Sequence, residues 1–143
     1  MKNGGHIMDN KIKIMIVDDH DFYRNALKLA LKKYPHLEVI SEVSNGNDFL
    51  NQYTNVKPDV VLMDIKMPGI DGVMATNMAM NKWSNVKIIA LTMYKERDYI
   101  MNMVFAGIKG VLFKDSAEQE IETAINKVCS GGYYYTKKID QLV

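Results

Sequence analysis

The residues that could do chemistry stand at the ends of short apolar runs, and they are Asp18, Asp19, Asp64, Thr92 and Lys114. Three carboxylates near one point repel one another, which raises the pKa of at least one of them unless a cation binds. Carboxylate oxygens are ligands that Mg²⁺ prefers. Beside such a cation an ionised aspartate can attack phosphorus and form an acyl phosphate, while a hydroxyl and an ammonium donate to phosphoryl oxygens. The set therefore predicts metal-assisted phosphoryl transfer to an aspartate.

Each of these residues also has an ordinary structural explanation when it is considered alone. An adjacent Asp pair can cap a helix, an Asp at a strand end is typical of turns, and a lysine in a loop is commonly solvated. Their occurrence after separate apolar runs favours a shared site, since several loops would otherwise have to place complementary groups together by chance. We interpret His20, which follows the acidic pair, as a loop histidine that caps a helix rather than as a metal ligand.

Short apolar runs alternate with helical patterns along the chain. The runs are rich in Ile and Val, as strands buried on both faces of a parallel sheet require, and they are 12–17, 37–40, 60–63, 86–91 and 110–113. The helical patterns lie at about 21–33, 46–52, 72–83, around 100–104 and around 121–128. Right-handed crossovers then predict an α/β fold, a doubly wound open parallel sheet of five strands with helices on both faces.

This alternation brings the chemistry together, because ligands of open α/β sheets bind beyond the carboxyl ends of the strands. The first helix must then cover the sheet with an apolar stripe. We expect that stripe to consist of Phe22, Ala26, Leu29 and Ala30.

The composition describes one globular domain of 143 residues, with 48% hydrophobic and 24% charged residues, and excludes disorder and fibrous repeats. A net charge of +1 argues against a free-standing nucleic-acid binder. Cys129 is the only cysteine, which excludes an intrachain disulfide and fits a reducing compartment. No secretory segment is visible, and no apolar run approaches the ~20 residues that span a bilayer. We expect a cytoplasmic protein without a membrane partner.

Sequence strings around these residues resemble the receiver domain of bacterial two-component response regulators. They occur in the family's order and are IMIVDDH at 14–20, VLMDIKMPGIDG at 61–72, ALT at 90–92 and VLFK at 111–114. The resemblance covers residues 11–131, which we assign to a receiver domain, and it implies a flavodoxin-like (βα)5 fold with strand order 2-1-3-4-5. We interpret residues 1–10 as an N-terminal tail, a candidate cloning remnant, and residues 132–143 as the start of an interdomain linker.

The resemblance implies roles for the acidic residues. Asp64 corresponds to the phosphoacceptor, and Asp18 and Asp19 correspond to the acidic pair that binds Mg²⁺ together with Asp64. The backbone carbonyl of Lys66 corresponds to a further ligand of the ion. The phosphoryl donor in this family is a phosphohistidine of a sensor histidine kinase. The receiver catalyses its own modification and slow autodephosphorylation, so we expect no turnover enzyme.

The resemblance also implies how the phosphorylated state is recognised and how long it lasts. Thr92 corresponds to a switch hydroxyl and Lys114 to a lysine, both of which contact the phosphoryl group. Lys66 and Tyr94 occupy positions that flank the path of attacking water, and both are large, so we expect them to slow autodephosphorylation. Val111 departs from the family pattern, because an aromatic residue that takes part in switching usually stands three residues before the lysine.

The tail GGYYY at 131–135, with LTM at 91–93 and KDS at 114–116, resembles the NarL/FixJ group of response regulators. In that group a LuxR-type helix-turn-helix domain that binds DNA follows the receiver, so we expect DNA contact, and with it transcription regulation, only through a missing C-terminal domain. One alternative is a stand-alone receiver that acts through protein contacts, and a homodimer formed on phosphorylation stays open. A remote alternative is a haloacid-dehalogenase-like phosphatase, which also uses Asp, Lys and Mg²⁺ but carries Asp-x-Asp after its first strand.

Overall fold

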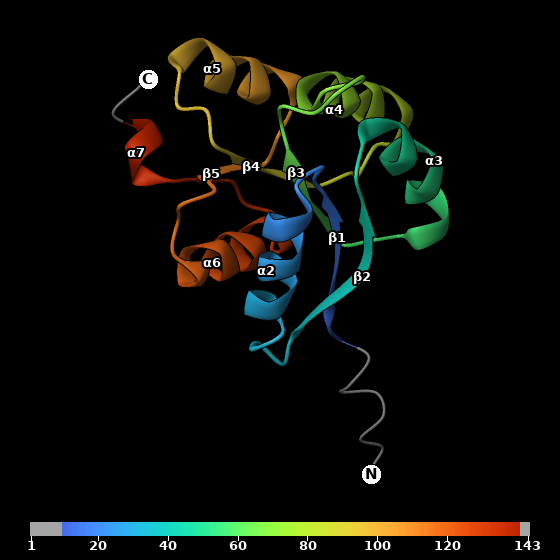
Figure 1. Cartoon of the computed structure of the whole chain (residues 1–143), viewed down its shortest axis with the longest axis vertical. Coiled ribbons are helices and arrows are strands. Elements are labelled where there is room, and N and C mark those ends of the chain that lie inside the picture. The colour runs from blue at the N-terminus through green and yellow to red at the C-terminus, as the bar shows by residue number, and fades with distance from the viewer. Residues whose placement is uncertain (1–9, 141–143) are drawn as a thin grey trace.

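The structure, a computed structural model, describes residues 10–140, so the N-terminal tail lies almost wholly outside the described residues. Parallel strands form one sheet of order β2-β1-β3-β4-β5-β6 between two layers of helices (Figure 1). The strands are β1 (Ile12–Val17), β2 (Leu37–Val43), β3 (Val60–Asp64), β4 (Ile88–Thr92), β5 (Gly110–Phe113) and β6 (Tyr134–Tyr135). The helices are α2 (Asp21–Leu31), α3 (Gly46–Val56), α4 (Gly72–Lys82), α5 (Arg97–Ala106), α6 (Glu118–Cys129) and α7 (Lys137–Asp140). The prediction of a doubly wound, flavodoxin-like parallel sheet is confirmed.

A sixth strand is added to the five that the sequence predicts. β6 pairs in parallel with β5, where the backbone N–H of Tyr134 donates to the carbonyl of Lys109 at 3.0 Å and that of Thr136 to Val111 at 3.1 Å. Ile139 of α7 is 2% exposed and joins the core. The described part of segment 132–143, which we interpret from the sequence as the start of a linker, therefore includes a strand and a helical turn that pack on the sheet.

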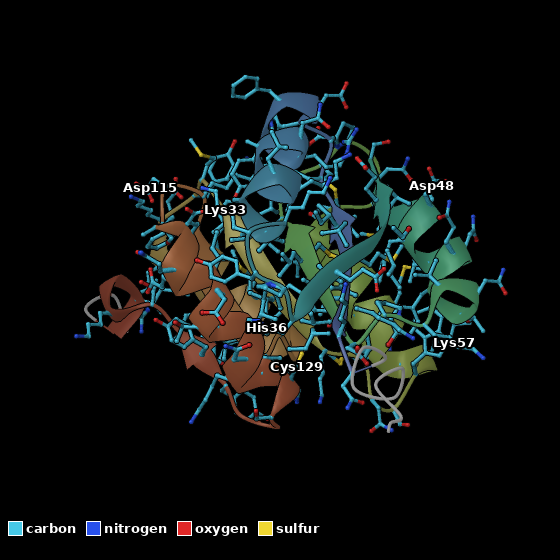
Figure 2. The ribbon with its side chains drawn as sticks, turned by 90° about the horizontal axis from the view of Figure 1, so that it is seen from below. Lys33, His36, Asp48, Lys57, Asp115 and Cys129 are labelled. Atoms are coloured by element: carbon cyan, nitrogen blue, oxygen red, sulfur yellow. The ribbon has the colours of Figure 1, made fainter. Side chains whose placement is uncertain are left out.

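The nearly continuous apolar runs supply a core on each face of the sheet. Alternate residues of β1 point to opposite sides: Met15 and Val17 join the core under α3, α4 and α5, while Ile14 and Ile16 join the core under α2 and α6. Ion pairs add to the second layer, where Lys33 contacts Glu118 and the His36 ring contacts Glu122 of α6. These pairs measure 3.0 Å each, and Figure 2 shows Lys33 and His36 beside that helix.

The prediction of the buried stripe on the first helix is wrong. Phe22 is 89% exposed and Leu29 is 68% exposed, whereas Leu27 and Leu31 are buried and Tyr23 packs partly against them. Both stripes have helical spacing, so periodicity alone does not tell which one contacts the sheet. The correction leaves Phe22, at the start of α2, and Leu29, near its end, exposed to solvent.

Candidate functional site

Three aspartates meet at the carboxyl edge of the sheet. Asp64 ends β3, and Asp18 and Asp19 follow β1, which is the neighbouring parallel strand. One ligand atom from each aspartate and one from His20 all lie within 4.8 Å of one another. Asp18 and Asp64 are 2% and 3% exposed, so their carboxylates are held largely out of water. Parallel pairing of β1 with β3 is what brings together residues that are far apart in the sequence.

Lys114 reaches into this cluster from the residue after β5. Its Nζ lies 2.8 Å from Asp18 Oδ2 and 3.4 Å from Asp64 Oδ2, and its side chain is 5% exposed. The ammonium also lies 4.6 Å from the centre of the Tyr23 ring. One buried cation therefore faces two buried carboxylates and leaves a net negative charge at the site.

The electrostatics of the site disfavour the ionised form of Asp64. Burial, and after it the negative charge of Asp18, raise the pKa of Asp64 to about 6, although Lys114 acts in the opposite direction. Asp64 Oδ2 and Asp19 Oδ1 are buried without a hydrogen-bond partner. A hard divalent cation would satisfy both oxygens and offset the repulsion, so these donors fit the Mg²⁺ that the sequence predicts.

Thr92 lies at the same edge but does not touch the acidic cluster in the described contacts. It ends β4, is fully buried, and its Oγ1 accepts a hydrogen bond from the backbone N–H of Tyr94 at 3.0 Å. The backbone N–H of Lys114 donates to the Thr92 carbonyl at 2.9 Å. The Thr92 hydroxyl is therefore hydrogen-bonded to the loop that follows β4. The Thr92 backbone is hydrogen-bonded to Lys114, whose ammonium lies in the acidic cluster.

The two residues predicted to tune the site, Lys66 and Tyr94, contact each other. Lys66 Nζ lies 4.6 Å from the ring centre of Tyr94 and 5.2 Å from that of Tyr99, and the two rings stack at 5.6 Å. Attraction between an ammonium and aromatic faces favours this arrangement. The contacts join the loop after Asp64 to the loop after Thr92.

His20 is a site residue that sequence reasoning ranked below a structural explanation. It occupies the N-cap position of α2, as expected, yet its side chain makes no capping hydrogen bond. Its Nδ1 instead lies 3.2 Å from Asp18 Oδ1, 3.3 Å from Asp19 Oδ1 and 3.4 Å from Asp64 Oδ2. The position of His20 directly after the acidic pair was the sequence signal that could have indicated its contact with the aspartates.

Tyr23 is a second residue that the sequence did not reveal. Its ring lies under Lys114, and its buried hydroxyl has no hydrogen-bond partner. Burial, together with the charges of Asp18 and Asp64, raises the pKa of this phenol, so Tyr23 stays neutral at the edge of the site. The sequence shows only two neighbouring aromatic residues, Phe22 and Tyr23, and spacing does not tell which of them points inward.

Comparison with known proteins assigns this arrangement to a family. Residues 14–126 match the family described as the response regulator receiver domain. The chain belongs to this family. The receiver assignment agrees with the resemblance stated from the sequence and favours it over the phosphatase alternative. Receiver domains bind Mg²⁺ at an acidic pocket, and they are typically signalling domains rather than enzymes.

Curated relatives and solved structures point to one group of receivers. The chain is 37% identical over 130 residues to the response regulator UvrY of Escherichia coli (strain K12), covering 91% of this chain and 60% of UvrY. It is 36% identical over 120 residues to the transcriptional regulatory protein LiaR of Bacillus subtilis (strain 168), covering 84% of this chain and 57% of LiaR. A two-component response regulator of the LuxR family from Aurantimonas sp. SI85-9A1 superposes with a TM-score of 0.87 at 27% identity, covering 92% of this chain and 94% of that one.

The receiver thus spans between 57% and 60% of the length of these two curated relatives. In the part of the chain that the structure describes, no helix has both the length and the apolar character needed to cross a bilayer.

Proposed function

We propose that this receiver accepts a phosphoryl group on Asp64 from a phosphohistidine of a sensor histidine kinase. The observation that carries the proposal is the buried Asp64 carboxylate, whose Oδ2 has no hydrogen-bond partner although Lys114 lies 3.4 Å away. Asp18, Asp19 and Asp64, with the backbone carbonyl of Lys66, would hold Mg²⁺. When bound, the ion supplies positive charge that offsets the carboxylates and the incoming phosphoryl oxygens.

The chain's own groups account for the transfer step. An ionised Asp64 oxygen forms the new bond to phosphorus as the bond from phosphorus to the donor histidine nitrogen breaks, and the released imidazole takes up a proton. With a pKa of about 6, Asp64 is mostly ionised at neutral pH. Lys114 offsets the charge of the phosphoryl group through its ammonium. The Thr92 hydroxyl, which only accepts from Tyr94 in this structure, keeps its proton for a phosphoryl oxygen.

Phosphorylation would switch the loop that follows β4. A Thr92 hydroxyl that turns to the phosphoryl group gives up its hydrogen bond from Tyr94, and the loop from Met93 to Arg97 then shifts. Val111, buried in the core at the position where an aromatic residue is usual, has no ring to move with it. The signal would therefore leave through the backbone of this loop rather than through an aromatic rotamer change.

The output of the switch is proposed from the relatives. UvrY and LiaR are longer than this chain and are named a response regulator and a transcriptional regulatory protein. We infer that this receiver controls a LuxR-type DNA-binding domain in transcription regulation, with a phosphorylation-dependent homodimer as one way to do so. The alternative is a stand-alone receiver that acts through protein contacts.

The test is phosphorylation by acetyl phosphate in the presence of Mg²⁺, followed by intact-mass analysis. Wild type should gain the mass of one phosphoryl group, and Asp64→Asn should gain none. Asp59 is the matched control because it precedes the strand that Asp64 ends, and its carboxylate accepts from the backbone N–H of Lys13 at 2.8 Å. Asp59→Asn should be phosphorylated like wild type. A mass gain that persists in Asp64→Asn would refute the site.

Tyr94→Ala is expected to accelerate autodephosphorylation by about threefold to tenfold, which corresponds to roughly 1 kcal/mol of activation free energy. The physical reason is that the ring and the Lys66 ammonium above it, 4.6 Å from its centre, screen the acyl phosphate from water. The loss of phosphorylated protein after removal of acetyl phosphate, followed by intact mass, gives the rate. Tyr133→Ala is the control, because the Tyr133 hydroxyl accepts a hydrogen bond from Lys109 Nζ near the amino end of β5, at the opposite edge of the sheet. An unchanged half-life in Tyr94→Ala would count against screening.

A further inference from the structure

The His20 ring lies on the rim of the acidic site, where neither the fold nor the proposed phosphoryl transfer accounts for it. Nδ1 approaches one oxygen from each of the three aspartates at 3.2, 3.3 and 3.4 Å. The ring is held there by its own backbone, because the His20 N–H donates to Asp18 Oδ1 at 2.8 Å. The imidazole side chain is 59% exposed, so it borders the site from the solvent side instead of filling it.

The Nδ1–oxygen distances are within hydrogen-bond range, as in the contact with Asp18 Oδ1, and they are also close enough for the four atoms to share a cation. Two ligands in neighbouring positions of an octahedral site with bonds of 2.0–2.1 Å lie about 3 Å apart. Asp64, 3% exposed, directs an oxygen without a hydrogen-bond partner into the same space, and Asp19 Oδ1 is likewise unpartnered. The buried Asp64 Oδ2, which makes no hydrogen bond although Lys114 Nζ lies 3.4 Å away, is a second observation that supports a cation ligand here.

Two contacts of the imidazole nitrogen make opposite demands on it. Lys114 Nζ, which only donates, and Asp18 Oδ1, a carboxylate oxygen, each lie 3.2 Å from His20 Nδ1, so the role of this nitrogen depends on the tautomer of the ring. A neutral imidazole nitrogen with an available lone pair is a common metal ligand.

We propose that His20 is a metal ligand through Nδ1 and that it shifts the selectivity of the site from Mg²⁺ toward cations that accept nitrogen ligands, with Mn²⁺ as the probe. The inference rests on the proposed function, because it concerns the same acidic site. Mg²⁺ prefers oxygen ligands and waters, whereas imidazole suits the transition metals, whose affinities also rise along the first row. An imidazole beside three carboxylates therefore adds affinity for Mn²⁺ more than for Mg²⁺.

The test compares Mg²⁺ and Mn²⁺ affinities of the metal-stripped full chain by isothermal titration calorimetry. Groups that only support a ligand are worth about 10–100-fold in metal affinity, so loss of the ligand itself in His20→Ala should weaken Mn²⁺ binding at least about tenfold. Mg²⁺ binding should change by less than about threefold, since a water can replace the imidazole. The matched control is His36→Ala, because His36 contacts Glu122 and Asn126 of α6.

A spectroscopic readout reports the ligand directly. Electron spin echo of bound Mn²⁺ should show nitrogen coupling from a coordinated imidazole in wild type and in His36→Ala, and none in His20→Ala. His20→Asn, which keeps a polar side chain at the helix start, should also bind Mg²⁺ and lack this coupling. Urea unfolding of each variant checks that the fold is retained.

The remaining outcomes overturn one proposal or the other. Equal changes in Mg²⁺ and Mn²⁺ affinity, or nitrogen coupling that persists without His20, would overturn the ligand role. Tighter binding of both cations by His20→Ala would show that the ring competes with the metal, which also overturns it. If wild type binds neither cation, the proposed metal-dependent function fails as well, whereas Mg²⁺ binding with no His20 effect on selectivity leaves that function intact.

Discussion

Gly72→Ala is expected to lower the free energy of unfolding by about 3 kcal/mol, the upper end of what overpacking costs. A Cβ at this position would lie 2.5 Å from the carbonyl oxygen of Asp64 and 2.7 Å from the Cα of Ile65. Both are backbone atoms, so they cannot move aside as a flexible side chain can. The Gly72 N–H also donates to the Ile65 carbonyl at 2.7 Å, which joins the start of α4 to the end of β3. Strain here displaces Asp64 itself.

Urea unfolding of wild type and Gly72→Ala measures the stability change, and phosphorylation by acetyl phosphate measures the effect on the site, which should be slower phosphorylation. Gly69→Ala is the matched control in the same loop. Gly69 has a φ of +76°, and a Cβ at this position would meet no atom within 4 Å, so only the left-handed backbone is penalised, at about 1 kcal/mol. If Gly72→Ala lost no more stability than Gly69→Ala, the close approach of α4 to β3 would be refuted.

Asp64→Asn is expected to stabilise the metal-free protein at pH 7 by as much as about 3 kcal/mol, from a pKa raised to about 6 against an ordinary 3.8. Between these two values the folded state binds a proton that the unfolded chain has released, so stability falls as pH rises through the window. Above pH 6 the wild type bears the full penalty of a buried charge. Below the lower value the penalty is absent, so the advantage of the variant should vanish toward acid pH.

Urea unfolding in the presence of EDTA, at pH 7 and again at acid pH near the lower end of the window, measures this difference. Mg²⁺ should then stabilise wild type more than Asp64→Asn, because the cation relieves a repulsion that the amide lacks. Asp59→Asn, at the other end of β3, should show neither effect. An Asp64→Asn variant that is less stable than wild type at pH 7 would mean that Lys114 more than offsets the burial of this carboxylate.

The covered parallel sheet could be predicted from the sequence because the pattern has a direct physical cause. Runs such as 12–17 and 60–63 are nearly continuous in Ile, Val, Leu and Met, and only strands covered on both faces can bury them. The short strand β6 could not be predicted in this way. Tyr134 and Tyr135 join the sheet through backbone hydrogen bonds to the β5 edge, and those bonds leave no pattern in the side chains.

The chemistry of the site was likewise present in the sequence. Asp64 ends a strand, and Asp18 and Lys114 each directly follow one. Parallel strands bring their carboxyl ends to one edge, so residue types and order were enough to predict that these residues meet. The sequence could not show that Lys114 pairs more closely with Asp18 than with Asp64. That choice depends on how far a long side chain reaches across the intervening strands.

Tertiary structure alone decided which neighbours of the acidic pair serve the site. Phe22 and Tyr23 are adjacent aromatic residues, yet one is exposed and the other lies under the Lys114 ammonium, because the rotation of α2 about its axis is set by packing on the sheet. The same rotation turns the His20 ring to the carboxylates instead of to its own helix. The sequence by itself determined the fold and the groups that do the chemistry, through local periodicity and strand ends. Contacts across space determined their partners, because side-chain direction follows from how whole elements pack.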